Sequence, residues 1–139
     1  RVAGNKKTWK LGIESPSTSK KRSALKVISF KNGGLATSGD YRNFYIDKKG
    51  KKRSHGISFR TGKPKENLTA SVTVFSAKDC MSADAWATAL MVSDLEKAKK
   101  LAESERIAAY FIYKANVNET DYVIHKTSAW TSIFEKGDI

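Results

Sequence analysis

Apolar and polar residues alternate in several short stretches of this chain, and the alternation predicts β-strands. A period of two residues places one set of side chains on each face of a strand. We expect strands in the segments 9–14, 24–31, 35–37, 43–46, 53–57, 69–76, 107–113, 122–125 and 130–134. The turn Asn32-Gly33-Gly34 joins the second and third segments and predicts a hairpin, because Asn and Gly adopt positive φ at low cost.

Two helices are predicted between the sixth and seventh strands. The first begins near Ala83, and its apolar stripe at helical spacing is made of Ala83, Ala87, Leu90 and Met91. The second follows Ser93-Asp94-Leu95-Glu96, which has the pattern of a capping box. Its inward residues are expected to be Leu95, Ala98, Leu101 and Ala102.

These elements together predict an α+β fold with a largely antiparallel sheet and two consecutive helices on one face. In segment 69–76, Val72 and Val74 face one side, whereas Ser71, Thr73 and Phe75 face the other. That strand is therefore expected to pack on both faces. The hairpin connections early in the chain favour antiparallel pairing.

The length of 139 residues corresponds to a single domain or a fragment of one. Apolar residues make up 40% of the chain, which is enough for a core, but no apolar run reaches the roughly 20 residues of a membrane span. The single Cys80 excludes an internal disulfide and a Cys-based zinc site. Because the sequence opens at Arg1 without an initiator Met, we expect it to be a trimmed or processed piece.

The net charge of +12 suggests a phosphate-bearing partner such as nucleic acid, a membrane surface or a nucleotide. No helix-turn-helix pattern and no RNA-binding aromatic signature accompany the basic clusters, so nucleic acid is not expected. An ordinary solvated surface is the preferred interpretation. A non-catalytic basic module that binds a polyanion or FAD is the alternative.

The first predicted helix carries a candidate metal pair. Asp84 and Thr88 are four residues apart, so their side chains lie on one helix face. A carboxylate and a hydroxyl oxygen on one face suit Mg²⁺, which prefers oxygen ligands. The plainer interpretation places Asp84 in the first turn, where the helix dipole favours it, and makes Thr88 a half-buried filler.

Three further residues are candidates for chemistry. His55 stands at the end of a predicted strand and could act as a general acid or base, or be structural. Arg60 and the following Thr61-Gly62 backbone could hold a phosphate. Asp40, in Ser38-Gly39-Asp40-Tyr41, could bond its own turn or a ligand. His125 has no motif around it and is expected to be structural.

Several segments, in this order, resemble the C-terminal part of the ApbE-like FAD:protein FMN transferases, once called thiamine biosynthesis lipoproteins. The similarity runs from about Trp9 to Phe134. The segments that carry it are Trp9-Lys10-Leu11-Gly12-Ile13, Ala36-Thr37-Ser38-Gly39-Asp40-Tyr41-Arg42-Asn43-Phe44, Ser54-His55-Gly56-Ile57, Arg60-Thr61-Gly62-Lys63-Pro64, Ala70-Ser71-Val72-Thr73-Val74 and Met81-Ser82-Ala83-Asp84-Ala85-Trp86-Ala87-Thr88-Ala89-Leu90.

The resemblance implies a Mg²⁺-dependent transfer of the FMN half of FAD to a Thr of a target protein, with release of AMP. Family targets are flavin-carrying subunits of membrane redox complexes. Asp84 and Thr88 match the family's metal-binding pair, Ile57 matches a position near the flavin nucleotide, and His55 matches the His that assists the reaction. Arg60 is then expected to help bind the FAD phosphates.

The chain also departs from the family pattern. Ser58 and Phe59 occupy positions where the family usually has Asp-Pro. The family's N-terminal half, with the remaining metal ligand and most of the flavin-binding surface, has no counterpart in these residues. We therefore expect this chain alone to be inactive and to bind FAD weakly or not at all. By analogy, the full-length protein is expected to be periplasmic, held to the inner membrane by an N-terminal lipid anchor.

Overall fold

The computed structural model describes residues 8–16, 23–39, 44–46, 52–54, 62, 68–116 and 121–135. These residues form eight strands and three helices. In chain order they are β1 (Trp9–Glu14), β2 (Ala24–Phe30), β3 (Gly34–Gly39), β4 (Phe44–Ile46), β5 (Lys52–Ser54), β6 (Thr69–Ser76), α1 (Cys80–Val92), α2 (Leu95–Ser104), β7 (Ala108–Tyr113), β8 (Val123–Lys126) and α3 (Ser128–Phe134).

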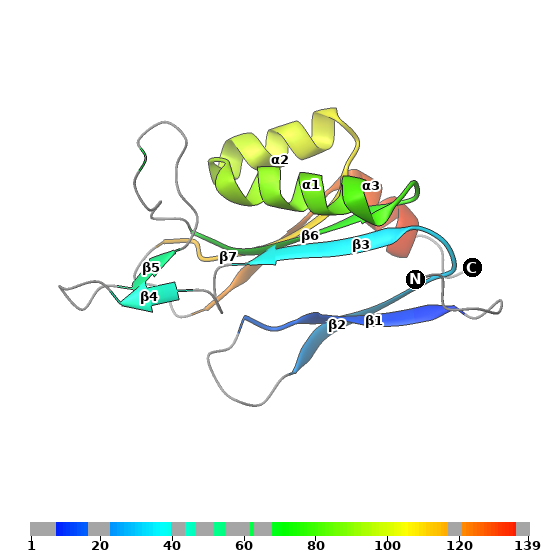
Figure 1. The fold of residues 1–139 in the computed structure, drawn as a ribbon, viewed down its shortest axis with the longest axis horizontal. Helices are drawn as coiled ribbons and strands as arrows, with labels where there is room; N and C mark the ends of the chain where they lie inside the picture. Colours follow the sequence, from blue (N-terminus) through cyan, green and yellow to red (C-terminus); the bar gives the residue numbers. More distant parts are fainter. Residues whose placement is uncertain are drawn as a thin grey trace.

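The main sheet has four antiparallel strands in the order β3-β6-β7-β8. The strands β1 and β2 form a separate antiparallel pair, as do β4 and β5. The two consecutive helices α1 and α2 connect β6 to β7 and cover one face of the main sheet (Figure 1). This arrangement confirms the predicted α+β fold. In the part of the chain that the structure describes, no helix has the length and apolar character needed to cross a membrane.

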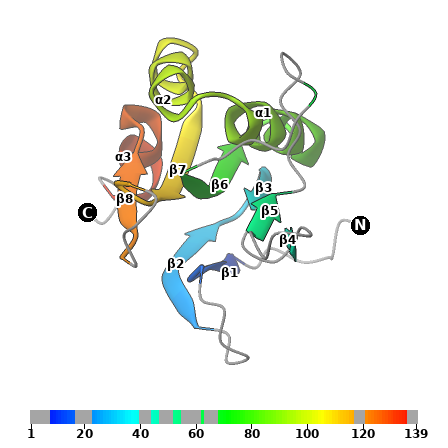
Figure 2. The same cartoon turned by 90° about the vertical axis from the view of Figure 1, so that its left-hand side faces the viewer.

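The main sheet is packed on both faces because its central strands alternate two sets of apolar side chains. Val72, Val74 and Phe111 point towards α1 and α2 and form the first core with the buried alanines of both helices. Phe75 and Tyr110 point the other way. There they meet the second core, which β1, β2 and α3 complete, and Figure 2 shows the β1–β2 pair on the side of the sheet away from α1 and α2. The prediction that segment 69–76 packs on both faces is confirmed.

The predicted hairpin between segments 24–31 and 35–37 is wrong. β2 pairs with β1, whereas β3 pairs with β6, so the chain passes from one sheet to the other at this turn. Gly33 does have a positive φ of 118°, as the turn pattern indicates. A Cβ atom added at Gly34 would clash with the backbone of Cys80. The strand after the turn is thus held against the start of α1 instead of folding back on β2.

The predicted strand at 130–134 is also wrong, because this segment lies within the helix α3. Thr127 is the N-cap of α3, and its hydroxyl accepts from the backbone N–H of Trp130 at 3.3 Å. Trp130 and Phe134 are four residues apart, and their rings pack with centroids 4.6 Å apart. The aromatic and β-branched composition favours a strand. The N-cap at Thr127 and the burial of Trp130 instead stabilise a helix.

Two details of α2 differ from the prediction. Its N-cap is Asp94, whose carboxylate accepts from the N–H of Lys97, while Ser93 is the C-cap of α1. Leu101, which was expected to face inward, is exposed. The buried residues of this helix are the small Ala98 and Ala102.

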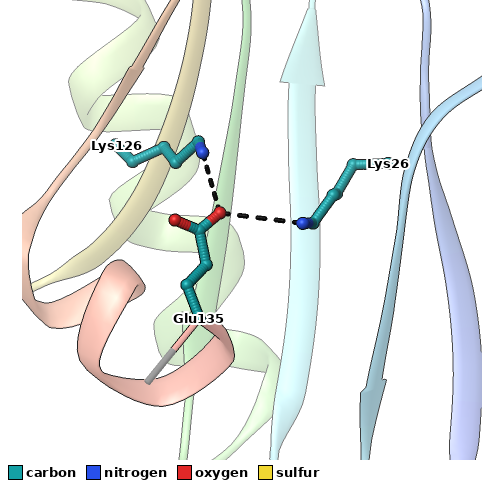
Figure 3. Close-up of polar contacts among 3 residues, drawn as sticks. All are labelled: Lys26, Lys126 and Glu135. Carbon is teal, nitrogen blue, oxygen red and sulfur yellow. Dashed lines mark hydrogen bonds and ion pairs between the residues drawn. The ribbon is translucent and has the colours of Figure 1, made fainter. Parts of the chain in front are cut away.

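A carboxylate at the end of α3 connects the β1–β2 pair to the main sheet. Glu135 accepts a hydrogen bond from Lys126 of β8 at 2.7 Å, and its oxygen lies 3.7 Å from Lys26 of β2 (Figure 3). The hydrogen bond from Lys126 is the largest cause that holds the pKa of Glu135 below its ordinary value of 4.5. All three side chains are partly exposed, so water weakens this attraction.

Candidate functional site

The start of α1 sets the position of the candidate metal pair. Asp79 is the N-cap, and its Oδ1 accepts from the backbone N–H of Ser82 at 2.6 Å. This bond is the main reason why the pKa of Asp79 lies below its ordinary value of 3.8. The helix therefore begins at Cys80, earlier than predicted, and Asp84 falls outside its first turn, which contains no acidic residue. The explanation of Asp84 by the helix dipole is wrong.

Asp84 and Thr88 both lie on the exposed side of α1. They follow directly after the buried Ala83 and Ala87, so they lie beside the stripe that packs on the sheet, where Ala83, Ala87 and Leu90 have an exposed fraction of 0%. The spacing of four residues brings the two side chains to adjacent turns, about 5–6 Å apart at Cβ. Thr88 is exposed, so the interpretation of this residue as half-buried filler is wrong. The carboxylate and the hydroxyl are both accessible to an ion from solvent.

Thr88 also contacts the edge strand of the main sheet. Its Oγ1 lies 3.3 Å from the Oγ of Ser38, near the end of β3. Ser38 is paired with Val72 in the β3–β6 register, which places its side chain on the face that α1 covers. The sequence motif pointed to Asp40 as a candidate and did not reveal Ser38. The signal that could have found it is a small hydroxyl residue next to a Gly.

The donors in this region fit a magnesium-type ion. Among the described residues there is no group of three or more His, Cys, Asp or Glu side chains that could hold a metal by itself. Asp84 and Thr88 supply one carboxylate and one hydroxyl oxygen. Mg²⁺ commonly binds one or two carboxylates and completes its shell with water and substrate phosphates. The residues present therefore suit an ion that a phosphate ligand shares.

Several predicted site residues lie outside the described residues. These are His55, Ile57, Arg60 and Asp40, together with the atypical pair Ser58-Phe59. The described residues of β5 reach Ser54, the residue before His55 in the sequence. Gly62, in the segment after Arg60, is exposed and has a φ of 62°. This conformation suits the loop predicted there, because Gly adopts positive φ without strain.

His125, predicted to be structural, lies on β8 beside the ring of Phe111, with ring centroids 5.9 Å apart. Its Nε2 is buried and has no hydrogen-bond partner within the described ranges. Burial is the main cause that lowers the pKa of His125 below 6.5, and the nearby Lys99 cation adds to the effect. These surroundings favour a neutral imidazole.

Comparison with known proteins gives one consistent family. The model of the ApbE family matches residues 1–111. The FAD:protein FMN transferase of Haemophilus influenzae is 36% identical over 129 residues, which are 93% of this chain and 36% of that protein. The enzyme of the same name from Escherichia coli K12 is 42% identical over 106 residues, which are 76% of this chain and 29% of that protein.

Solved structures give the same result. The apo form of the flavinyl transferase ApbE from Pseudomonas stutzeri superposes with a TM-score of 0.71 and 34% identity, covering 91% of this chain and 36% of that one. The flavin transferase ApbE from Vibrio cholerae has a TM-score of 0.70 and 32% identity, covering 89% of this chain and 37% of that one. The chain thus spans about a third of the length of these relatives.

Proposed function

This chain belongs to the ApbE family, as its sequence motifs predicted, and we propose that the complete gene product that carries it is a FAD:protein FMN transferase. The relatives' names state a transfer from FAD to a protein. The observation in this structure that supports the proposal best is the exposed pair Asp84 and Thr88 on α1. Two oxygen donors one helical turn apart, open to solvent, suit an ion that also binds a diphosphate.

The proposed reaction is a phosphoryl transfer to a Thr hydroxyl of the target protein. The hydroxyl oxygen forms a bond to the phosphorus of the FMN half of FAD, and the bond from that phosphorus to the AMP oxygen breaks. AMP leaves with the electron pair, and the hydroxyl proton passes to a base. Mg²⁺ bound at this site would neutralise the charge of the diphosphate and of the leaving group.

This chain's own residues have separate tasks in the proposal. Asp84 and Thr88 would hold the ion that neutralises the diphosphate. His55 accepts the proton of the target hydroxyl, and Ile57 and Arg60 bind the nucleotide; these three assignments are predictions from the sequence. By the same family membership, we propose that the targets are flavoprotein subunits of membrane redox complexes, reached on the periplasmic side by an enzyme with a lipid anchor.

Covalent flavinylation of a target protein tests the proposed function directly. The complete gene product is incubated with FAD, Mg²⁺ and a flavoprotein subunit, and the target is analysed by mass spectrometry and in-gel fluorescence. The expected result is a mass increase of one FMN on a Thr residue, with release of AMP. Chelation of the metal should abolish the transfer. A wild-type protein that leaves several such targets unmodified, with Mg²⁺ and FAD present, argues against the function.

The Asp84→Ala variant tests whether the transfer activity depends on this site. Asp84 is exposed, so its removal should leave the fold intact, and we expect at least a 100-fold loss of transfer because a metal ligand is lost. Circular dichroism and thermal unfolding provide the control for folding. Retained transfer in Asp84→Ala would remove this pair from the mechanism.

We also propose that the 139-residue chain by itself does not perform the transfer, since it spans about a third of its relatives. Isothermal titration of the folded chain with FAD and Mg²⁺ should show weak binding or none. Micromolar binding of FAD would show instead that these residues contain a sufficient nucleotide site.

A further inference from the structure

β3 and α1 lie side by side at the edge of the main sheet and run in the same direction (Figure 1). At the start of both elements, Gly34 lies against the backbone of Cys80, so closely that a Cβ atom would not fit. Further along, Ser38 meets Thr88. The strand from Gly34 to Ser38 spans about 13 Å, and the helix from Cys80 to Thr88 spans about 12 Å. The contact at the start therefore keeps Ser38 opposite Thr88.

The hydroxyl of Thr88 needs an acceptor if its oxygen is to bind a cation. A neutral hydroxyl ligand keeps its proton, which must point away from the ion, while a lone pair points towards it. The Oγ of Ser38 lies 3.3 Å from Thr88 Oγ1 and can accept that proton. This distance is longer than the roughly 2.5–3.0 Å that is usual between two hydroxyl oxygens. An ion bound to Thr88 would make its O–H a stronger donor and shorten the contact.

The neighbouring hydroxyl on β3 serves a different contact. Thr37 Oγ1 bonds Thr73 Oγ1 of β6 at 2.8 Å, and the β3–β6 register places this pair on the sheet face away from α1. Thr37 thus holds two strands together, whereas Ser38 reaches the helix. Thr37 is next to Ser38 on β3 but faces the other side of the sheet, so a variant at Thr37 is a matched control for a variant at Ser38.

We propose that Ser38 is a positioning residue of the metal site: it accepts the proton of the Thr88 hydroxyl and thereby directs the Thr88 oxygen towards the ion held by Asp84. This inference rests on the proposed function for the identity of the ion. Groups that orient metal ligands typically change metal affinity by about 10- to 100-fold when they are removed. Ser38 acts through Thr88, so its effect should depend on the presence of the Thr88 hydroxyl.

The test is a Mn²⁺ titration of the complete gene product, with free Mn²⁺ followed by electron paramagnetic resonance. Ser38→Ala is expected to raise the Kd for Mn²⁺ about tenfold, and Ser38→Thr, which keeps the hydroxyl, should restore most of the affinity. Thr37→Val should leave the Kd unchanged, although it lowers the melting temperature by removing the bond to Thr73. Thermal unfolding of every variant separates loss of the site from loss of the fold.

A double-mutant cycle distinguishes positioning from direct metal binding. If Ser38 acts through Thr88, the double variant Ser38→Ala/Thr88→Val should bind Mn²⁺ as weakly as Thr88→Val alone. Additive losses would overturn the inference, because Ser38 would then act independently of Thr88. An unchanged Kd in Ser38→Ala, or no saturable Mn²⁺ binding by the wild-type protein, would also overturn it.

The proposed function and this inference can fail separately. A wild-type protein that binds Mn²⁺ in a Ser38-dependent way but never flavinylates a target refutes the transferase proposal alone. A protein that flavinylates with dependence on Asp84, while Ser38→Ala keeps the wild-type Kd and the wild-type metal dependence of transfer, refutes the role of Ser38 alone.

Discussion

The two faces of the main sheet are packed by different kinds of side chain. The face under α1 and α2 is rich in alanine: Ala83, Ala87, Ala98, Ala102 and Ala109 are buried there beside larger side chains such as Leu90, Met91 and Phe111. The opposite face, under β1, β2 and α3, is packed by the large rings of Phe30, Phe75, Tyr110, Trp130 and Phe134. One sheet therefore carries an alanine-rich interface on one side and one rich in aromatic rings on the other.

This difference explains why the candidate site lies on the helical face. Alanines let the backbone of α1 approach the sheet closely, so the short side chains of Ser38 and Thr88 can meet. Large side chains at Ala83 and Ala87 would hold the helix too far away for that contact. The helical face should therefore be sensitive to added volume, and the aromatic face to lost volume.

The largest effect on stability is expected from Trp130→Ala on the aromatic face. Trp130 is fully buried, and its removal leaves a cavity that costs about 3–5 kcal/mol in the free energy of unfolding. Its indole N–H has no hydrogen-bond partner in the described part of the chain, so the loss is one of packing. Trp130→Phe is the matched control and should lose much less. Urea unfolding measures both, and equal losses in the two variants would contradict this account.

The next largest effect is expected from Ala87→Leu on the helical face. Ala87 is fully buried between α1 and the sheet, so the added volume should destabilise the protein by about 1–3 kcal/mol. It should also lift α1 from β3 and weaken Mn²⁺ binding. Ala89→Leu, at an exposed position of the same helix, is the control. Unchanged Mn²⁺ affinity in Ala87→Leu would show that the site does not depend on close helix packing.

A smaller effect is expected from the partly buried His125, also on the helical face. Its pKa is lowered by burial and by Lys99, so below about pH 6.5 the unfolded chain binds a proton that the folded protein resists. The stability that His125 contributes is therefore present above pH 6.5 and is lost as the pH falls. His125→Phe should flatten the decrease in unfolding free energy between pH 7.5 and 5.5. If wild type and variant lose the same unfolding free energy over this pH range, titratable groups other than His125 cause the loss.

The smallest effect is expected from Glu135→Gln, which breaks the contact between the β1–β2 pair and β8. Because the ion pairs are partly exposed, the loss should be at most about 1 kcal/mol. The pKa of Glu135 is lowered, so its contribution is present above pH 4.5 and lost at more acidic pH. At 1 M salt the difference between wild type and variant should nearly vanish. A difference that persists there would point to a contact other than ion pairing.

Elements with a strong local pattern could be predicted from the sequence. β6 alternates cleanly between two buried faces, and the stripe from Ala83 to Met91 marks the buried side of α1. The pair Asp84 and Thr88 was found because a spacing of four residues fixes a shared helix face. These features depend on neighbours within one or two turns.

Features that depend on distant partners could not be predicted. The Asn32-Gly33-Gly34 turn showed where the chain bends, but the pairing of β3 with β6 is set by residues some 40 positions away. Trp130 favours a strand by composition, and its place in the aromatic core, together with the cap at Thr127, makes its segment helical. Ser38 and Thr88 are separated by 50 residues, so their contact is visible only in the folded protein.

The most direct test of the account is to locate a divalent ion in crystals of the complete gene product grown with Mn²⁺ and FAD. Anomalous scattering identifies the Mn²⁺ position without assumptions about the ligands. A peak is expected at bonding distance, about 2.1 Å, from both the Asp84 carboxylate and the Thr88 hydroxyl, next to the FAD diphosphate. A fully occupied Mn²⁺ elsewhere in the protein, with Asp84 and Thr88 bound only to water, would contradict it.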